Sequence, residues 1–159
     1  MAEPAFNILF LSRRNSARGI LAEAVVNYKG KGRFRAFSAG DEPDDQLDPV
    51  ALNILELSGY PTDGLHPKHW KEFVGPGAVP LDFVFKLSDH ETEEPPEWPG
   101  HPVTADWRYP DPASFSGEDW ERRKALSEIL GALERQFSAF SQLPSEALKE
   151  KSLRSKHTQ

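Results

Sequence analysis

The fold is decided by one stretch of sequence, Phe6-Asn7-Ile8-Leu9-Phe10-Leu11-Ser12-Arg13-Arg14-Asn15-Ser16-Ala17-Arg18. Its first six residues form a short apolar run, which is typical of a parallel strand buried on both faces. After Arg18, apolar residues recur at i, i+3, i+4 and i+7, as in an amphipathic helix; they are Leu21, Ala24, Val25 and Tyr28. Because a helix that follows such a strand points free N–H groups toward the strand's carboxyl end, residues 12–18 are predicted to form an oxyanion-binding loop.

The chemistry of the 12–18 loop supports this prediction. A tetrahedral oxyanion would receive several backbone N–H bonds and a bidentate guanidinium from Arg18. Positive charge at a helix N-terminus is unfavourable unless an anion is present, so a purely structural Arg18 is the weaker interpretation. The phosphate-loop patterns GxxxxGKS and GxxxxGKT do not occur, which excludes an NTPase loop of that type.

Strand and helix signals alternate along the rest of the chain. This alternation predicts an α/β fold with a parallel sheet and right-handed crossovers. Further strands are predicted over residues 33–37, 81–87 and 102–107, and helices over residues 48–59, 68–73 and 117–140. From Pro144 onward the chain is polar with mixed charge, so we expect one domain over residues 5–143 and a frayed tail over residues 144–159.

Composition places the chain among ordinary globular proteins. Its 159 residues are enough for one packed domain. The formal net charge of -6 argues against general nucleic-acid binding. Two acidic stretches, residues 41–45 and 89–97, are expected to be solvated loops. No run approaches the roughly 20 apolar residues that span a bilayer, and the start lacks the basic and apolar regions of a signal peptide, so we expect a cytoplasmic protein.

The chain contains no cysteine. That composition removes disulfides, thiolate metal sites, thiol redox chemistry and cysteine nucleophiles. His66 and His69 have a spacing that two metal ligands could use, but no third ligand is clearly grouped with them in the sequence. We therefore expect neither a metal nor another cofactor.

The sequence resembles a known family, the low-molecular-weight protein tyrosine phosphatases, and in particular their bacterial arsenate-reductase-like branch. The resemblance implies an α/β fold with a four-stranded parallel sheet flanked by helices. It covers most of residues 6–143 in the right order, and its motifs are Ile8 to Leu11, Ser12-x5-Arg18, Ile20-Leu21-Ala22-Glu23-Ala24, Ser38-Ala39-Gly40, Phe83-Val84-Phe85, Trp98-Pro99-Gly100, Thr104-Ala105-Asp106-Trp107 and Tyr109-Pro110-Asp111-Pro112-Ala113.

The resemblance also implies roles for individual residues. In the family a cysteine nucleophile opens the loop, an arginine grips the phosphoryl oxygens, and an aspartate before a proline protonates the leaving group. These positions correspond to Ser12, Arg18 and Asp111. The loop asparagine that holds the shape by hydrogen bonds corresponds to Asn15. The residues expected to bind the oxyanion are then Arg13, Arg14, Asn15, Ser16, Ala17 and Arg18. For Arg13 and Arg14 two roles stay open, a position at the rim of the site or a solvated charge on the loop.

Aromatic residues on the loop of Asp111 flank the substrate in the family. Trp107 and Tyr109 correspond to that region. Core packing is the alternative role for both.

Several departures from the family pattern bear on chemistry. Ser12 replaces the cysteine, and a serine hydroxyl needs an adjacent general base, which no histidine in or beside the loop supplies. Gly19 replaces a serine that hydrogen-bonds the thiolate in the family. Ser88 and Pro95 stand where redox members carry further cysteines. We therefore expect no arsenate reduction, and at most weak phosphomonoester hydrolysis.

Three hypotheses follow. The first is a divergent family member that binds phosphate-like oxyanions with little or no catalysis. The second is an active phosphatase or arsenate reductase in which Ser12 is a trapping substitution for a natural cysteine. The third is a regulatory module that binds phosphoproteins. The expected ligands are phosphate, arsenate or a phosphorylated substrate, and the sequence does not indicate an oligomeric state.

Overall fold

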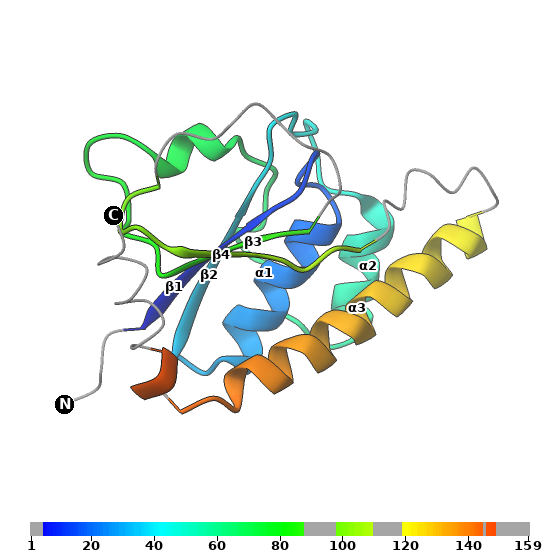
Figure 1. The fold of residues 1–159 in the computed structure, drawn as a ribbon. Helices are drawn as coiled ribbons and strands as arrows, with labels where there is room; N and C mark the ends of the chain where they lie inside the picture. Colours follow the sequence, from blue (N-terminus) through cyan, green and yellow to red (C-terminus); the bar gives the residue numbers. More distant parts are fainter. Residues whose placement is uncertain (1–4, 88–97, 110–118, 145, 149–159) are drawn as a thin grey trace.

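A computed structural model shows a parallel sheet between two unequal layers (Figure 1). The structure describes residues 5–87, 98–109, 119–144 and 146–148. In chain order the elements are β1 (Phe6–Leu11), α1 (Arg18–Lys29), β2 (Phe34–Ala39), α2 (Pro49–Leu57), the 3₁₀ helix η1 (Trp70–Phe73), β3 (Phe83–Lys86), β4 (Val103–Asp106) and α3 (Asp119–Ser141).

The sheet has four strands in the order β2-β1-β3-β4, and every neighbouring pair is parallel. This confirms the prediction of an α/β fold with a four-stranded parallel sheet flanked by helices. Strand β1 lies in the interior, with Leu11 beside both Ala39 of β2 and Lys86 of β3. The chain therefore leaves the carboxyl end of β1 at the middle of the sheet edge, where ligands bind in open α/β sheets.

The two faces of the sheet are covered differently (Figure 1). Helices α1, α2 and α3 lie on one face, where Ile8 and Phe10 of β1 point into the larger core. On the other face Leu9 packs with Phe73 of η1 and with Trp98. Because successive side chains of a strand point to opposite faces, β1 is apolar throughout, as its sequence predicted.

The chain end after α3 differs from the expectation. Residues 146–148 are helical, and Leu148 is fully buried in the larger core. Burial of the Leu148 side chain against an apolar surface favours docking of this segment. The packed region thus extends beyond residue 143, and residues 149–159 lie outside the described ranges.

None of the helices in the described ranges is long and apolar enough to cross a membrane.

Candidate oxyanion-binding site

The 12–18 loop connects the end of β1 to the start of α1 and rests on the end of β2. The Ser12 N–H donates to the Ala39 carbonyl at 3.1 Å. Gly40 follows, and a Cβ at that position would lie 2.4 Å from the Ser12 carbonyl oxygen and 2.5 Å from that of Arg13. Only glycine permits this approach, which explains the Ser38-Ala39-Gly40 turn in the sequence.

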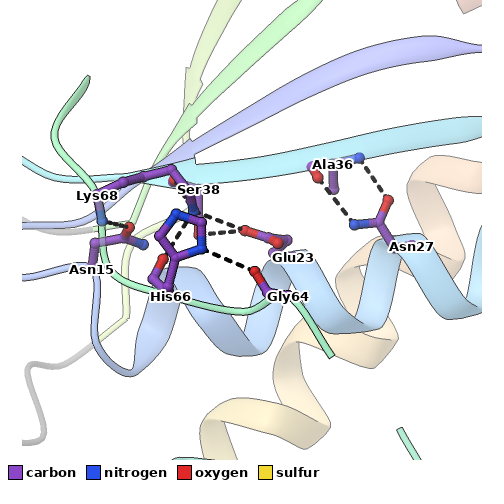
Figure 2. A network of polar contacts seen from close by, with 8 residues as sticks. All are labelled: Asn15, Glu23, Asn27, Ala36, Ser38, Gly64, His66 and Lys68. Carbon is purple, nitrogen blue, oxygen red and sulfur yellow. Dashed lines mark hydrogen bonds and ion pairs between the residues drawn. The ribbon is translucent and has the colours of Figure 1, made fainter. Parts of the chain in front are cut away.

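Asn15 has the left-handed backbone conformation, with φ of 50°. Its side-chain oxygen accepts a hydrogen bond from the Lys68 N–H at 2.8 Å (Figure 2). Asparagine tolerates this conformation better than most residues, and the hydrogen bond fixes the bend of the loop. The bond joins the loop to the backbone at Lys68, and the shape-holding role that the resemblance implies for Asn15 stays a prediction.

A polar network beneath the loop fixes Lys68 in turn (Figure 2). The Lys68 ammonium donates to the Ser38 carbonyl at 3.0 Å and lies 3.6 Å from the Glu23 carboxylate. The same carboxylate accepts a 2.6 Å hydrogen bond from the Ser38 hydroxyl. Since both charged side chains are largely buried, pairing them avoids an uncompensated buried charge. The network joins α1, β2 and the segment before η1.

Arg18 is the first residue of α1 and is buried, with 6% of its surface exposed. Its Nη1 donates to the Tyr109 carbonyl at 3.0 Å. The first turn of α1 contains no acidic residue, and the N-cap residue Ala17 makes no side-chain capping bond. The positive end of the helix and a buried guanidinium thus lie together, which is an arrangement that an anion stabilises.

Ser12 is 3% exposed, and its Oγ has no hydrogen-bond partner among the residues that the structure describes. The Asn15 amide nitrogen Nδ2 is also buried without a partner there. Both atoms face Gly19, since a Cβ at that position would lie 2.9 Å from Ser12 Oγ and 3.0 Å from Asn15 Nδ2. No side chain among the described residues accepts the Ser12 proton.

The acidic segment, residues 41–45, contacts the loop directly. Arg13 lies 3.4 Å from the Glu42 carboxylate, and Arg14 lies 3.5 Å from the Asp44 carboxylate. Ser16 Oγ donates to Asp44 at 2.8 Å. The segment is an exposed loop at Glu42, as expected, but Glu42 and Asp44 also pair with cations of the 12–18 loop. Residues 89–97, the other acidic stretch, lie outside the described residues.

A cavity of about 360 Å³ opens beside the loop. Its far wall comes from the residues that lead into α2 and from Arg122 of α3, which pairs with Asp48. Sequence reasoning missed Arg122, because its only local context is a charged helix start. Asp48 is the N-cap of α2, and its side chain accepts hydrogen bonds from the Val50 and Ala51 N–H groups. The lining residues are Ser12, Arg14, Asn15, Ser16, Ala17, Arg18, Asp44, Gln46, Leu47, Asp48, Pro49 and Arg122.

Of the segment after β4, the structure describes residues 107–109. Trp107 is buried, and its ring stacks on Phe85 with centroids 4.1 Å apart, so it is a core residue and does not flank the cavity. Tyr109 contributes its carbonyl to Arg18, while its hydroxyl bonds to Gln136. Asp111 lies outside the described residues, as do Ser88 and Pro95.

The fold and the loop define a class of protein. Residues 7–154 match the low molecular weight phosphotyrosine protein phosphatases, and the chain belongs to this family. It is a member with Ser12 at the head of the loop and no cysteine anywhere in its sequence.

The relatives include arsenate reductases. The glutaredoxin arsenate reductase of Synechocystis is 29% identical over 111 residues, which are 70% of this chain and 82% of that protein. Among solved structures, an arsenate reductase in the phosphate binding state is 24% identical with a TM-score of 0.65, and the match covers 84% of this chain and 98% of that one. The thioredoxin-dependent arsenate reductase of Corynebacterium glutamicum is 22% identical with a TM-score of 0.61. That match covers 87% of this chain but only 63% of the longer protein, and at these identities both structures establish the fold alone.

Proposed function

We propose that this protein binds phosphate-like oxyanions in the 12–18 loop and catalyses little or no chemistry there. One observation carries the proposal: buried Arg18 lies at the start of α1, whose first turn has neither an acidic residue nor a side-chain cap. An external anion would be attracted by both the guanidinium and the positive helix end. The adjoining cavity of about 360 Å³ has room for a small ligand.

The surroundings of Ser12 argue against nucleophilic catalysis. A serine hydroxyl is essentially un-ionised at neutral pH and needs a neighbouring base to attack phosphorus. Within the described ranges Ser12 Oγ makes no hydrogen bond at all. Arsenate reduction needs a thiol, and the chain has none.

Gly19 weakens the hypothesis of a trapping substitution. If only the nucleophile were replaced, the family's serine at position 19 would remain beside it. In this chain a Cβ at position 19 would lie 2.9 Å from Ser12 Oγ, a distance that real Cβ atoms essentially never show. The loop and Gly19 thus fit each other without that serine. This fit favours a site that has diverged at two positions.

Phosphate and arsenate are the first ligands to test. They share tetrahedral shape and charge, and an arsenate reductase of the same fold has been solved in a phosphate binding state. A phosphorylated small molecule or protein would present the same group. We assign no nucleic-acid or membrane partner.

Calorimetric titration with phosphate and with arsenate tests the binding. We expect both anions to bind, and we expect Arg18→Met to weaken binding at least about tenfold, because a charge-assisted bidentate contact is lost. Arg35→Met, at an exposed position of β2, removes the same charge and is the matched control. If the unaltered protein binds neither anion, the proposal is wrong.

Hydrolysis of p-nitrophenyl phosphate tests the catalytic part. We expect the unaltered protein and Ser12→Ala to be equally slow, because the hydroxyl is passive. Ser12→Cys should hydrolyse the ester well above both, since a thiol ionises far more readily. If Ser12→Ala instead lost a rate that the unaltered protein possesses, Ser12 would be a working nucleophile.

A further inference from the structure

The acidic segment places a carboxylate within the cavity that the 12–18 loop lines. Asp44 is part of the lining, and it accepts a 2.8 Å hydrogen bond from Ser16 Oγ. Its other oxygen lies 3.5 Å from Arg14 Nη1. Two of the loop side chains that could contact a bound anion therefore already contact an anion of the protein itself.

Backbone hydrogen bonds hold this carboxylate in place. The Glu42 N–H donates to the Arg13 carbonyl and the Asp44 N–H to the Arg14 carbonyl, both at 3.0 Å. The same two residue pairs, Arg13 with Glu42 and Arg14 with Asp44, also form ion pairs, so main chain and side chains fix the same alignment of the two segments. Asp44 is thus positioned by the fold and is not a charge on a loose loop.

Asp48 is the other carboxylate among the lining residues, and both of its oxygens also have partners. One caps α2, and the other pairs with Arg122. Asp48 is only 3% exposed in its side chain, whereas that of Asp44 is 37% exposed. A ligand that enters the cavity therefore meets the Asp44 carboxylate.

We propose that Asp44 is a specificity-determining residue of this site. It selects phosphate monoesters whose carrier is neutral or cationic near the phosphoryl group, and it rejects those with a second negative charge there. This inference rests on the proposed oxyanion binding and adds the ligand class. A like charge placed beside a fixed carboxylate is repelled, and a cationic group is attracted.

Matched aryl phosphates provide the test. Phenyl phosphate, 4-carboxyphenyl phosphate and 4-(aminomethyl)phenyl phosphate share the phosphoryl group and the ring, and their para substituents are neutral, negative and positive. In calorimetric titrations we expect the unaltered protein to bind phenyl phosphate about fivefold more tightly than the carboxylated ester, and the aminomethyl ester at least as tightly as phenyl phosphate.

Variants of the acidic segment isolate the contact. Asp44→Asn should abolish the discrimination among the three esters, and Asp44→Glu should retain it. Asp45→Asn is the matched control, because Asp45 is exposed and has no hydrogen bond or ion pair within the described part of the chain. It removes the same charge from the same segment and should leave the discrimination intact.

The outcomes separate this inference from the proposed function. If the esters bind but Asp44→Asn and Asp45→Asn change the discrimination equally, net charge governs it and the assignment of Asp44 is wrong. Equal affinities of the unaltered protein for all three esters would also overturn it. If neither the unaltered protein nor any variant binds phenyl phosphate or inorganic phosphate, the proposed function itself fails. Circular dichroism of Asp44→Asn shows whether a loss of binding in that variant reflects unfolding.

Discussion

Gly40 lies beneath the 12–18 loop, where its backbone approaches that of Ser12 and Arg13. A methyl group at this position would meet two carbonyl oxygens at 2.4 and 2.5 Å, and backbone atoms cannot move aside as a flexible side chain can. We expect Gly40→Ala to lower the free energy of unfolding by about 2–3 kcal/mol, measured by urea denaturation. The anion affinity should fall with it, because the loop must shift.

A second glycine provides the control for that substitution. Gly131 lies within α3, and a Cβ there would meet only Arg135 Nη1, at 3.3 Å, the end of a flexible side chain. Gly131→Ala should therefore raise the free energy of unfolding by about 0.5–1 kcal/mol through helix propensity. Equal effects of the two substitutions would contradict the close approach described for Gly40.

At the level of secondary structure, Asp48 connects α2 to α3. Its Oδ1 accepts from the Val50 N–H at 2.9 Å, and its Oδ2 pairs with Arg122. Asp48→Ala removes the cap and leaves Arg122 without this partner, so we expect a loss of about 2 kcal/mol in the free energy of unfolding.

Asp48→Asn separates the two contributions, because asparagine still caps a helix but carries no charge. We expect Asp48→Asn to lower the free energy of unfolding less than half as much as Asp48→Ala in the same urea titration. Arg122 is partly exposed, so water can solvate its guanidinium when the partner charge is removed. If the two variants were equally unstable, the ion pair and not the cap would hold the start of α2.

At the level of the whole molecule, the stability should depend on alkaline pH. Burial raises the pKa of Tyr60, as does its hydrogen bond to the Glu134 carboxylate. Burial also raises the pKa of Tyr109. Above the ordinary pKa of about 10, the unfolded chain releases these protons while the folded protein keeps them. The stabilisation is therefore complete below pH 10 and is lost as the pH rises, by up to about 1.4 kcal/mol per pH unit for each tyrosine.

Urea denaturation between pH 8 and pH 11.5 measures this dependence. Tyr60→Phe should flatten the alkaline decline, because phenylalanine has no proton to lose. Tyr28 contacts the Tyr60 ring and is the smallest of the causes that raise its pKa, so Tyr28→Phe should flatten the decline only slightly. An unchanged slope in Tyr60→Phe would show that Tyr60 does not carry the effect.

The sequence predicts the parts of this molecule that depend on neighbouring residues. The strand, loop and helix of residues 6–29 follow from periodicity, and the N-cap Asp48 follows from its place before Pro49. The contacts of Arg14 with Asp44 and of Arg122 with Asp48 join segments 30 and more residues apart. Such pairings depend on how the elements pack, and no local pattern encodes them.

The same distinction explains the differences at Trp107 and Leu148. Trp107 follows a strand, and only the position of Phe85 on the next strand makes it a core residue. Leu148 stands alone in a polar sequence, so periodicity does not reveal that it covers the core. A single apolar residue becomes informative only when the surface that it covers is known.

The hydrogen bond from Arg18 to the Tyr109 carbonyl links the 12–18 loop to the segment after β4. Anion binding at the loop and local opening at Tyr109 should therefore be coupled. If an anion binds more tightly when Arg18 is held by this hydrogen bond, then the bound anion must stabilise the Tyr109 segment against local opening by the same free energy. The Tyr109 N–H is itself bonded to the Leu87 carbonyl at 2.9 Å, so its rate of exchange with solvent deuterium reports that opening. If the loop binds an anion as proposed, its occupancy should therefore change the exchange rate of an amide that lies 91 residues along the chain from Arg18.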